Sequence, residues 1–250
     1  MIQLDSSKPN TKSRRMPHRT SVSSRVAPWL SALLYPLAHY LVLPAYFRNI
    51  DVTGQGNLPQ SGTIILAPTH RARWDPILVA YLTGRRVTGR DPRFMTSENE
   101  TTGLQGWLVR RLGAFPVDMT RAGISSLRHV VDLLLHREML VLFPEGNTFF
   151  TKRNIEKSNP DPEQLYPIKP GLGRLAMQAE EQRPDLDIHI VPMSIRYSTG
   201  TPTWRCDVRV RIGESIEARD YFNGSVKKSA KKLTAQLRER LEILHGVRER

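Results

Sequence analysis

The sequence has very little cysteine: of its 250 residues, Cys206 alone carries a thiol. One cysteine cannot form an internal disulfide framework, nor a cysteine-cluster zinc or iron–sulfur site. Because disulfides are rare in reducing compartments, this composition favours a reducing setting that faces the cytosol. Hydrophobic residues make up 39% of the chain, which is enough for a core and excludes disorder throughout.

Acidic residues are scarce relative to basic ones. The chain has 37 lysine and arginine residues against 24 aspartate and glutamate residues, for a formal net charge of +13. A surface this basic favours nucleic acid, anionic lipid or a phosphorylated substrate as partner. The sequence shows no helix-turn-helix, zinc-finger or RNA-stacking motif, and its charge concentrates near both ends beside apolar or amphipathic segments. We therefore expect anionic membrane lipid as a partner, and no nucleic acid.

A long uninterrupted hydrophobic run is also missing. The longest apolar stretch, residues 26–47, contains Pro28, Pro36 and Pro44. The last two would each remove a helical hydrogen bond and favour a kink. A straight helix of this length would reach about 30 Å, the thickness of the hydrocarbon core of a bilayer. The prolines favour broken helices embedded in one leaflet, with a true span and a buried soluble helix as the alternatives.

Composition divides the chain into three parts. Residues 1–25 are basic and rich in serine, threonine and proline, which predicts a disordered tail, either a transit peptide or a basic arm on anionic lipid. Residues 26–47 are the membrane-associated helical segment. Residues 48–250 alternate short apolar stretches with amphipathic ones, which predicts an α/β domain with a mixed, largely parallel sheet and helices on both faces.

The hydrophobic periodicity locates the elements of this domain. We expect strands near 50–53, 63–67, 93–96, 140–143, 189–196 and 206–212, and helices near 75–83, 103–111, 121–137, 171–183 and 225–246. The last helix repeats leucine at helical spacing beside a strongly basic face. It either packs on the domain or lies on a membrane surface.

One segment combines residues that can carry chemistry. An apolar strand at 63–67 leads to His70 in a turn, and Asp75 with Pro76 then begins a helix as its N-cap and first residue. The loop between them can fold His70 and Asp75 together. A carboxylate that accepts one ring N–H leaves the other imidazole nitrogen as a base for an alcohol. Because no G-x-S-x-G motif is visible, the histidine would act directly on a substrate hydroxyl.

A second segment leads from an apolar strand into a polar loop at Glu145 and Gly146. Glycine allows a ligand to approach the backbone closely, and open α/β sheets bind ligands at the carboxyl ends of their strands. Glu145 is therefore a candidate for binding hydroxyl groups, although a plain strand-to-loop turn is the alternative.

Four blocks follow one another in order: His70-x4-Asp75, Gly113–Asp118, Phe143–Gly146 and Ile190–Pro192. They resemble the blocks of the glycerolipid acyltransferases, the 1-acylglycerol-3-phosphate O-acyltransferase family. The resemblance implies transfer of a fatty acyl group from acyl-CoA or acyl-carrier protein, as co-substrate, to the hydroxyl of a lysoglycerolipid in phospholipid biosynthesis. The sequence indicates no metal site, and we expect no cofactor. We also expect the protein on the cytoplasmic face of a membrane.

The resemblance also implies roles for individual residues. His70 is the general base, Asp75 orients it, Glu145 and Gly146 line the acceptor site, and Pro192 lies in the block associated with the acyl donor.

At two positions the sequence departs from the family. Met119 and Thr148 stand where arginines usually bind the acceptor phosphate, and Asn147 stands in place of the threonine before the second of these arginines. The substitutes are Arg121, Lys152, Arg153 or Lys169, and Asn147 with Arg121 are the acceptor-binding candidates there. Alternatively, the acceptor is another lysolipid or alcohol, or the protein is a catalytically silent membrane-surface binding protein.

Overall fold

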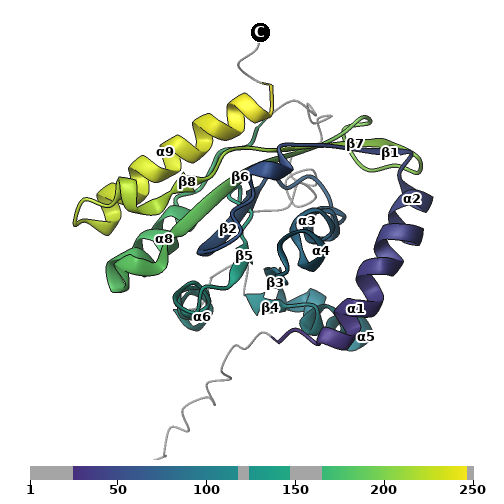
Figure 1. The fold of residues 1–250 in the computed structure, drawn as a ribbon, viewed down its shortest axis with the longest axis horizontal. Helices are drawn as coiled ribbons and strands as arrows, with labels where there is room; N and C mark the ends of the chain where they lie inside the picture. Colours follow the sequence, from purple (N-terminus) through teal and green to yellow (C-terminus); the bar gives the residue numbers. More distant parts are fainter. Residues whose placement is uncertain (1–24, 118–123, 147–164, 247–250) are drawn as a thin grey trace, which may run out of the picture.

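A computed structural model describes residues 25–117, 124–146 and 165–246 of the chain. These residues form an eight-stranded sheet with the order β1-β7-β6-β2-β5-β3-β4, and β8 pairs with β6 (Figure 1). The strands are β1 (Asn49–Thr53), β2 (Thr63–Pro68), β3 (Arg93–Ser97), β4 (Ala114–Val117), β5 (Met139–Val141), β6 (Ile188–Tyr197), β7 (Asp207–Ile212) and β8 (Ile216–Glu217). Only the pairings of β6 with β7 and with β8 are antiparallel, so the predicted mixed, largely parallel sheet is confirmed.

Helices cover both faces of this sheet, as predicted. The helices are α1 (Pro28–Leu37), the π-helical η1 (Ala38–Val42), α2 (Leu43–Tyr46), α3 (Asp75–Thr83), α4 (Arg85–Thr88), α5 (Gly103–Arg111), α6 (Ile124–Leu135), α8 (Gly171–Gln182) and α9 (Val226–Leu244). Short 3-10 turns lie at 55–57, 98–101, 184–186 and 218–221. Figure 1 shows α6, α8 and α9 on one side of the central strands, and α3 with the α1–α2 helix on the other.

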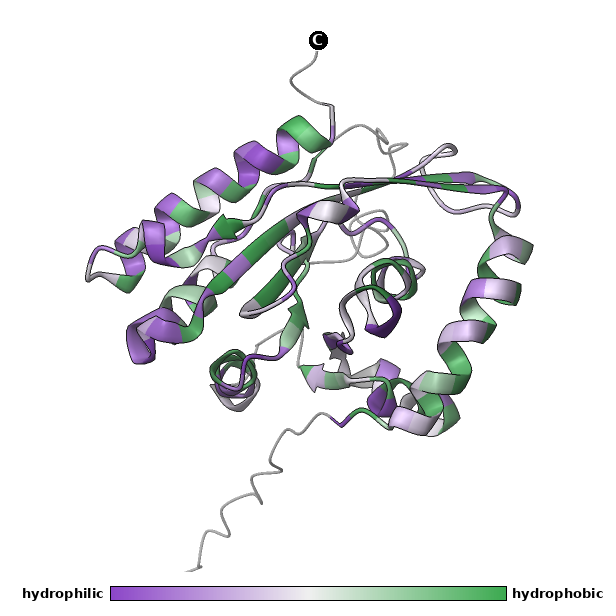
Figure 2. Cartoon of the chain, viewed as in Figure 1, coloured by the Kyte–Doolittle hydropathy of each residue, from purple (hydrophilic) through white to green (hydrophobic). Residues whose placement is uncertain are grey.

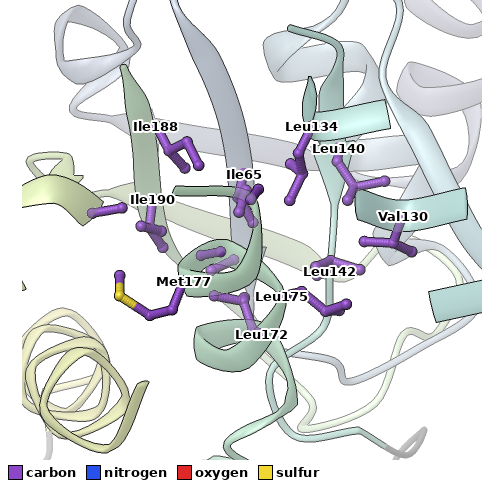
Figure 3. Packing of buried hydrophobic residues seen from close by; sticks show 14 of the residues in the cluster. Ile65, Val130, Leu134, Leu140, Leu142, Leu172, Leu175, Met177, Ile188 and Ile190 are labelled. Carbon is purple, nitrogen blue, oxygen red and sulfur yellow. The ribbon is translucent and has the colours of Figure 1, made fainter. Parts of the chain in front are cut away.

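The central strand β2 shows why both faces are covered. Successive side chains of a strand point to opposite faces. Ile65 and Ala67 belong to one buried cluster with α6, α8 and α9, whereas Ile64 and Leu66 belong to a second cluster with α2 and α3. Figure 3 shows the first cluster, with Ile65 among side chains from α6, α8 and the neighbouring strands. A strand buried on both sides reads as the continuous apolar run seen at 63–67.

Most predicted elements of the domain lie within one or two residues of the observed ones, and the structure adds three. The hydrophobic periodicity did not predict β4, β8 and α4. β4 has only four residues and contains Pro116, which a strand at the edge of a sheet tolerates because its N–H side is not needed for pairing. β8 has two residues and α4 has four, so neither can show a hydrophobic period.

The apolar segment at 26–47 stays helical through its prolines. Pro28 occupies the first turn of α1, Pro36 lies inside α1 and Pro44 in α2, and the π-helical turn η1 lies between the last two. A proline removes one backbone donor from a helix, and a π-helical turn accommodates the loss by shifting the hydrogen-bond pattern to more distant partners. The predicted break is therefore a local change of helix type. Among the helices of the described residues, none combines the length and the hydropathy needed to cross a bilayer. The predicted disordered tail lies outside the described residues, apart from Arg25.

Candidate active site

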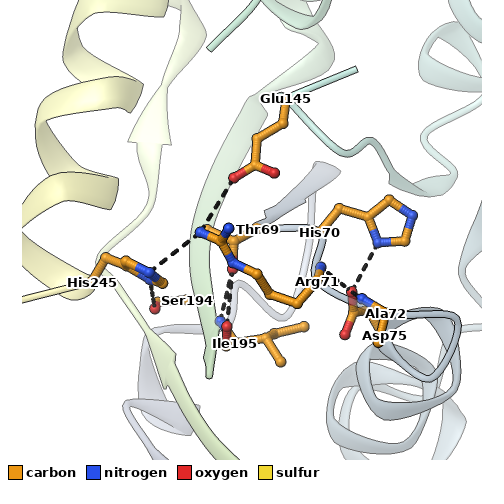
Figure 4. Close-up of polar contacts among 9 residues, drawn as sticks. All are labelled: Thr69, His70, Arg71, Ala72, Asp75, Glu145, Ser194, Ile195 and His245. Atoms are coloured by element: carbon orange, nitrogen blue, oxygen red, sulfur yellow. Dashed lines mark hydrogen bonds and ion pairs between the residues drawn. The ribbon is translucent and has the colours of Figure 1, made fainter. Parts of the chain in front are cut away.

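His70 and Asp75 meet at the carboxyl end of β2. The strand ends at Pro68, two residues before His70, and α3 begins at Asp75. The intervening turn brings the Nδ1 atom of His70 to 2.8 Å from a carboxylate oxygen of Asp75 (Figure 4). Asp75 is fully buried and His70 is 8% exposed. The predicted pairing of the two side chains is therefore observed.

The local role predicted for Asp75 was wrong. The N-cap of α3 is Trp74, and Asp75 is the first residue of the helix. Its carboxylate turns back to the preceding turn, where it accepts the backbone N–H groups of Arg71 at 2.5 Å and Ala72 at 2.6 Å. Both donors belong to the turn between β2 and α3, so the carboxylate of Asp75 fixes the conformation of the turn that carries His70. Because both N–H groups already donate to Asp75, neither is free to donate to a negatively charged oxygen that forms on a bound substrate.

Tyr197 is a member of the site that the sequence did not indicate. Its hydroxyl donates to the second carboxylate oxygen of Asp75 at 2.6 Å, from the last residue of β6. Burial, followed by the charge of Asp75, raises the pKa of Tyr197, so the hydroxyl keeps its proton and remains a donor. With both oxygens occupied, Asp75 stays a fixed acceptor for His70. No sequence signal links the two residues, which are 122 positions apart.

The geometry leaves one nitrogen of His70 for chemistry. A carboxylate can only accept, so the ring must donate its Nδ1–H to Asp75. Nε2 then carries a lone pair, and it makes no hydrogen bond to any described residue. The ring of Phe143 stacks against the face of the imidazole, with ring centroids 3.9 Å apart and planes 20° from parallel. The ring is thus fixed in both tautomer and orientation, as a general base requires.

The third block joins the first through buried charges. Glu145 follows Phe143 in the loop after β5, and its carboxylate is 3.6 Å from the guanidinium of Arg71. Both side chains are buried. Gly146 has a φ of +73°, and a Cβ there would lie 2.7 Å from the Cδ atom of Lys169. Only glycine suits that position.

Strand β6, which contains the fourth block, contacts the turn before His70 through Thr69. Its hydroxyl accepts the N–H of Ile195 at 2.9 Å, and its N–H donates to the carbonyl of Met193. Pro192 is buried in β6 opposite Ala67, at the point where the partner of β6 changes from β8 to β7. Its carbonyl accepts the N–H of Gly213 there. A proline fits because regular pairing is interrupted at that residue.

The second block lies apart from the other three. Its strand β4 is at the edge of the sheet, and β5 and β3 separate it from β2. Arg121, which follows the second block, lies outside the described residues. The candidates after the third block also lie outside them: Asn147, Lys152 and Arg153. Lys169 is described and is exposed next to Gly146. Within the described ranges, no three His, Cys, Asp or Glu side chains are grouped to hold a metal ion.

Comparison with known proteins identifies the family. A family model described as acyltransferase matches residues 49–196, more than half of the chain. The chain belongs to this acyltransferase family. The matched range contains all four blocks, and His70 and Asp75 lie within it.

Two known proteins resemble this acyltransferase family member, one in sequence and one in fold. A 1-acyl-sn-glycerol-3-phosphate acyltransferase of Streptococcus pneumoniae is 30% identical over 106 residues, which are 41% of this chain and 37% of that protein. The alignment thus spans little more than a third of that relative's length. The crystal structure of the 1-acyl-sn-glycerophosphate (LPA) acyltransferase PlsC from Thermotoga maritima has a similar fold, with a TM-score of 0.57 at 18% identity. That likeness covers 81% of this chain and 73% of the other.

Proposed function

We propose that this acyltransferase family member transfers a fatty acyl group from acyl-CoA or acyl-carrier protein to the free hydroxyl of a lysophosphatidate-like glycerolipid, in phospholipid synthesis. The observation that carries the proposal is the oriented His70 ring, with Nδ1 bound to a buried Asp75 and Nε2 left to accept a proton. The activity named for the Streptococcus pneumoniae relative supports the choice of substrates.

In the proposed reaction, Nε2 of His70 removes the proton from the acceptor hydroxyl as its oxygen attacks the carbonyl carbon of the thioester. Asp75 stabilises the imidazolium that forms, because its carboxylate already accepts the Nδ1–H. The tetrahedral adduct then collapses, the carbon–sulfur bond breaks, and the imidazolium returns its proton to the thiolate. The products are the acylated lipid and the free thiol, with no acyl group attached to the protein.

Lys169 is the proposed partner of the acceptor phosphate among the described residues. Its aliphatic part packs against Gly146, and its ammonium nitrogen would lie 3.2 Å from a Cβ at that glycine. A lysine interacts with phosphate as a mobile point charge, whereas arginine can bind two oxygens in a plane. The replacement therefore fits a lysophosphatidate acceptor with weaker geometric selection of the phosphate.

A panel assay tests the proposed reaction. Purified protein is offered acyl-CoA and acyl-carrier protein with lysophosphatidate, lysophosphatidylcholine and lysophosphatidylglycerol. We expect product with lysophosphatidate, and a fall in rate of at least about 100-fold in His70→Ala, the usual effect of losing a general base. The Lys169→Met variant should raise KM for lysophosphatidate and leave KM for the acyl donor unchanged. An unchanged rate in His70→Ala would mean that the chain is a binding protein or uses another base.

We further propose that the protein works on the cytoplasmic face of a membrane, bound through the α1–α2 helix. Five large apolar side chains of this helix are exposed at helical spacing, with Trp29 and Leu33 both 61% exposed; they are Trp29, Leu33, Leu37, Tyr40 and Leu41. Figure 2 shows this helix in pale and green shades, whereas α9 alternates purple with green. Contiguous exposed apolar side chains typically mark a lipid or protein contact.

Vesicle binding tests this location. The double variant Leu33→Gln, Leu37→Gln should partition into phosphatidylglycerol vesicles at least about tenfold more weakly, since each leucine contributes about 1.5 kcal/mol or more when it leaves water. Ile243→Gln, which changes an exposed apolar residue of α9, is the matched control and should bind normally. Equal binding by both variants would reject this helix as the contact.

A further inference from the structure

The C-terminal end of α9 reaches the active-site loops through His245. The helix ends at Leu244, and Gly246 follows with a φ of +74°, the left-handed conformation that commonly ends a helix. Arg196 donates to the carbonyl of His245 at 3.0 Å, which places a cation at the negative end of the helix dipole. The backbone on both sides of His245 is therefore fixed, and its side chain is fully buried.

His245 bridges β6 and the catalytic turn (Figure 4). Its Nδ1 atom is 2.8 Å from the hydroxyl oxygen of Ser194, and its Nε2 atom is 3.3 Å from a guanidinium nitrogen of Arg71. Arg71 and His245 are 174 positions apart in the sequence. The same guanidinium nitrogen of Arg71 is 3.6 Å from Glu145, so one buried chain of contacts connects α9 to two of the family's blocks.

The chemistry of these groups determines the tautomer of His245. A guanidinium has five N–H donors and no acceptor, so Nε2 of His245 must accept from Arg71. The ring proton is then on Nδ1, where it donates to Ser194. The arrangement therefore requires a neutral ring in one tautomer.

We propose that His245 is a positioning residue for acyl transfer, acting through Arg71. It fixes the guanidinium that holds Glu145, and Glu145 lies two residues after Phe143, which stacks on His70. The contacts run from α9 to the loop beside the general base without touching the reacting atoms. This inference rests on the proposed function, because the positioned loop is the proposed acceptor site.

Two substitutions of His245 separate positioning from simple packing. His245→Phe preserves the ring volume but removes the hydrogen bonds to Ser194 and Arg71, whereas the amide of His245→Gln can accept from Arg71 and donate to Ser194. We expect His245→Phe to lower kcat/KM for the acceptor at least about tenfold, with KM for the acyl donor nearly unchanged, because small displacements of a site are costly. His245→Gln should recover most of that loss.

Controls make the kinetic result decisive. Ile243→Gln changes an exposed residue two positions earlier and should behave as the wild type. If His245→Phe does not fold, Ser194→Ala takes its place, because it keeps the imidazole and its contact with Arg71 and removes the hydroxyl that accepts the Nδ1–H. Wild-type kinetics in His245→Phe, or equal losses in His245→Phe and His245→Gln, would overturn the positioning role.

An NMR measurement decides the network independently of activity. Two-bond ¹H–¹⁵N spectra of histidine-labelled protein distinguish the two neutral tautomers from the charged ring, and the His245→Gln spectrum identifies the His245 signals. We expect a neutral ring with its proton on Nδ1, and loss of that signature in Arg71→Met. A proton on Nε2, or a charged ring at neutral pH, would overturn the inference. Absence of acyl transfer in the wild type would instead reject the proposed function and leave this measurement valid.

Discussion

The two faces of the sheet differ in what their side chains do. On one face, α6, α8 and α9 close over a core that contains Leu233, Leu237 and Leu241, all of them buried. On the other face, α3 starts at Asp75, the partner of His70, and the α1–α2 helix leaves large apolar side chains exposed. The first face chiefly stabilises the fold, whereas the second carries the polar groups and surface that the proposed chemistry uses.

The difference has a physical basis in burial. A fully buried leucine contributes about 1.5–3 kcal/mol relative to an exposed one, so the α9 side gains stability from each turn of the helix. Asp75 is also fully buried, but its burial is favourable only because four donors meet its two oxygens. The stability of a buried charged group thus depends on a complete set of hydrogen-bond partners, whereas the stability of an apolar core depends on how well side chains fill its volume.

Asp75→Ala is the strongest test of this division, because Asp75 should serve both purposes. We expect kcat to fall at least about 100-fold, as in His70→Ala. We also expect the free energy of unfolding to fall by about 3 kcal/mol or more, since the N–H groups of Arg71 and Ala72 and the hydroxyl of Tyr197 all lose their acceptor. Kinetics and urea denaturation measure the two effects. Native stability in Asp75→Ala would show that the turn does not depend on the carboxylate.

Leu237→Ala tests the opposite face alone. Leu237 is 1% exposed in the core between α8, α9 and the sheet. Truncation should reduce the free energy of unfolding by about 2–5 kcal/mol and leave the kcat of the folded protein within about twofold of the wild type. The measurement is denaturation together with activity corrected for the folded fraction. A specific loss of kcat would mean that the packing of α9 controls the site more broadly than His245 alone.

Tyr197→Phe sharpens the comparison within the catalytic face. The change removes only the hydroxyl that donates to Asp75 at 2.6 Å and keeps the ring beside Phe47. We expect a loss of about 1–3 kcal/mol of stability, because one buried carboxylate oxygen loses its donor. A fall in kcat of up to about tenfold should follow as Asp75 gains freedom. If kcat falls as far as in Asp75→Ala, the hydroxyl itself takes part in the reaction.

Tyr197 also shows where sequence reasoning stops. The pairing of His70 with Asp75 was predictable, because a turn of only six residues, 69–74, connects β2 to the start of α3. Histidine and aspartate are also residue types that commonly pair in acid–base sites. Strand β2 was predictable because a run of buried apolar residues is visible in the sequence. Tyr197 lies 122 positions from Asp75, His245 lies 174 positions from Arg71, and Ser194 lies 51 positions from His245. Only the tertiary fold, through the order of strands in the sheet, brings these residues together.

The local conformation at Asp75 was mispredicted for a related reason. An aspartate followed by proline is typical of an N-cap, and the pattern located the start of α3 correctly. The carboxylate instead accepts from residues 71 and 72, because the preceding turn folds over it. Propensity therefore identified the helix boundary, and tertiary structure decided the hydrogen bonds.

Glu180 provides the smallest test, on the stabilising face. This residue of α8 is 3% exposed, and burial raises its pKa, with Arg219 partly opposing the shift. The native state therefore holds the proton to higher pH than the unfolded chain, so its contribution to stability falls as pH rises from the ordinary glutamate pKa through the raised one. Glu180→Gln removes this dependence. Glu180→Gln should therefore gain stability relative to the wild type between pH 4 and pH 8, as measured by the free energy of unfolding. Glu181→Gln, at an exposed neighbour, should show a smaller difference. A reversed sign for Glu180→Gln would mean that Arg219 dominates, and that this face also depends on a paired charge.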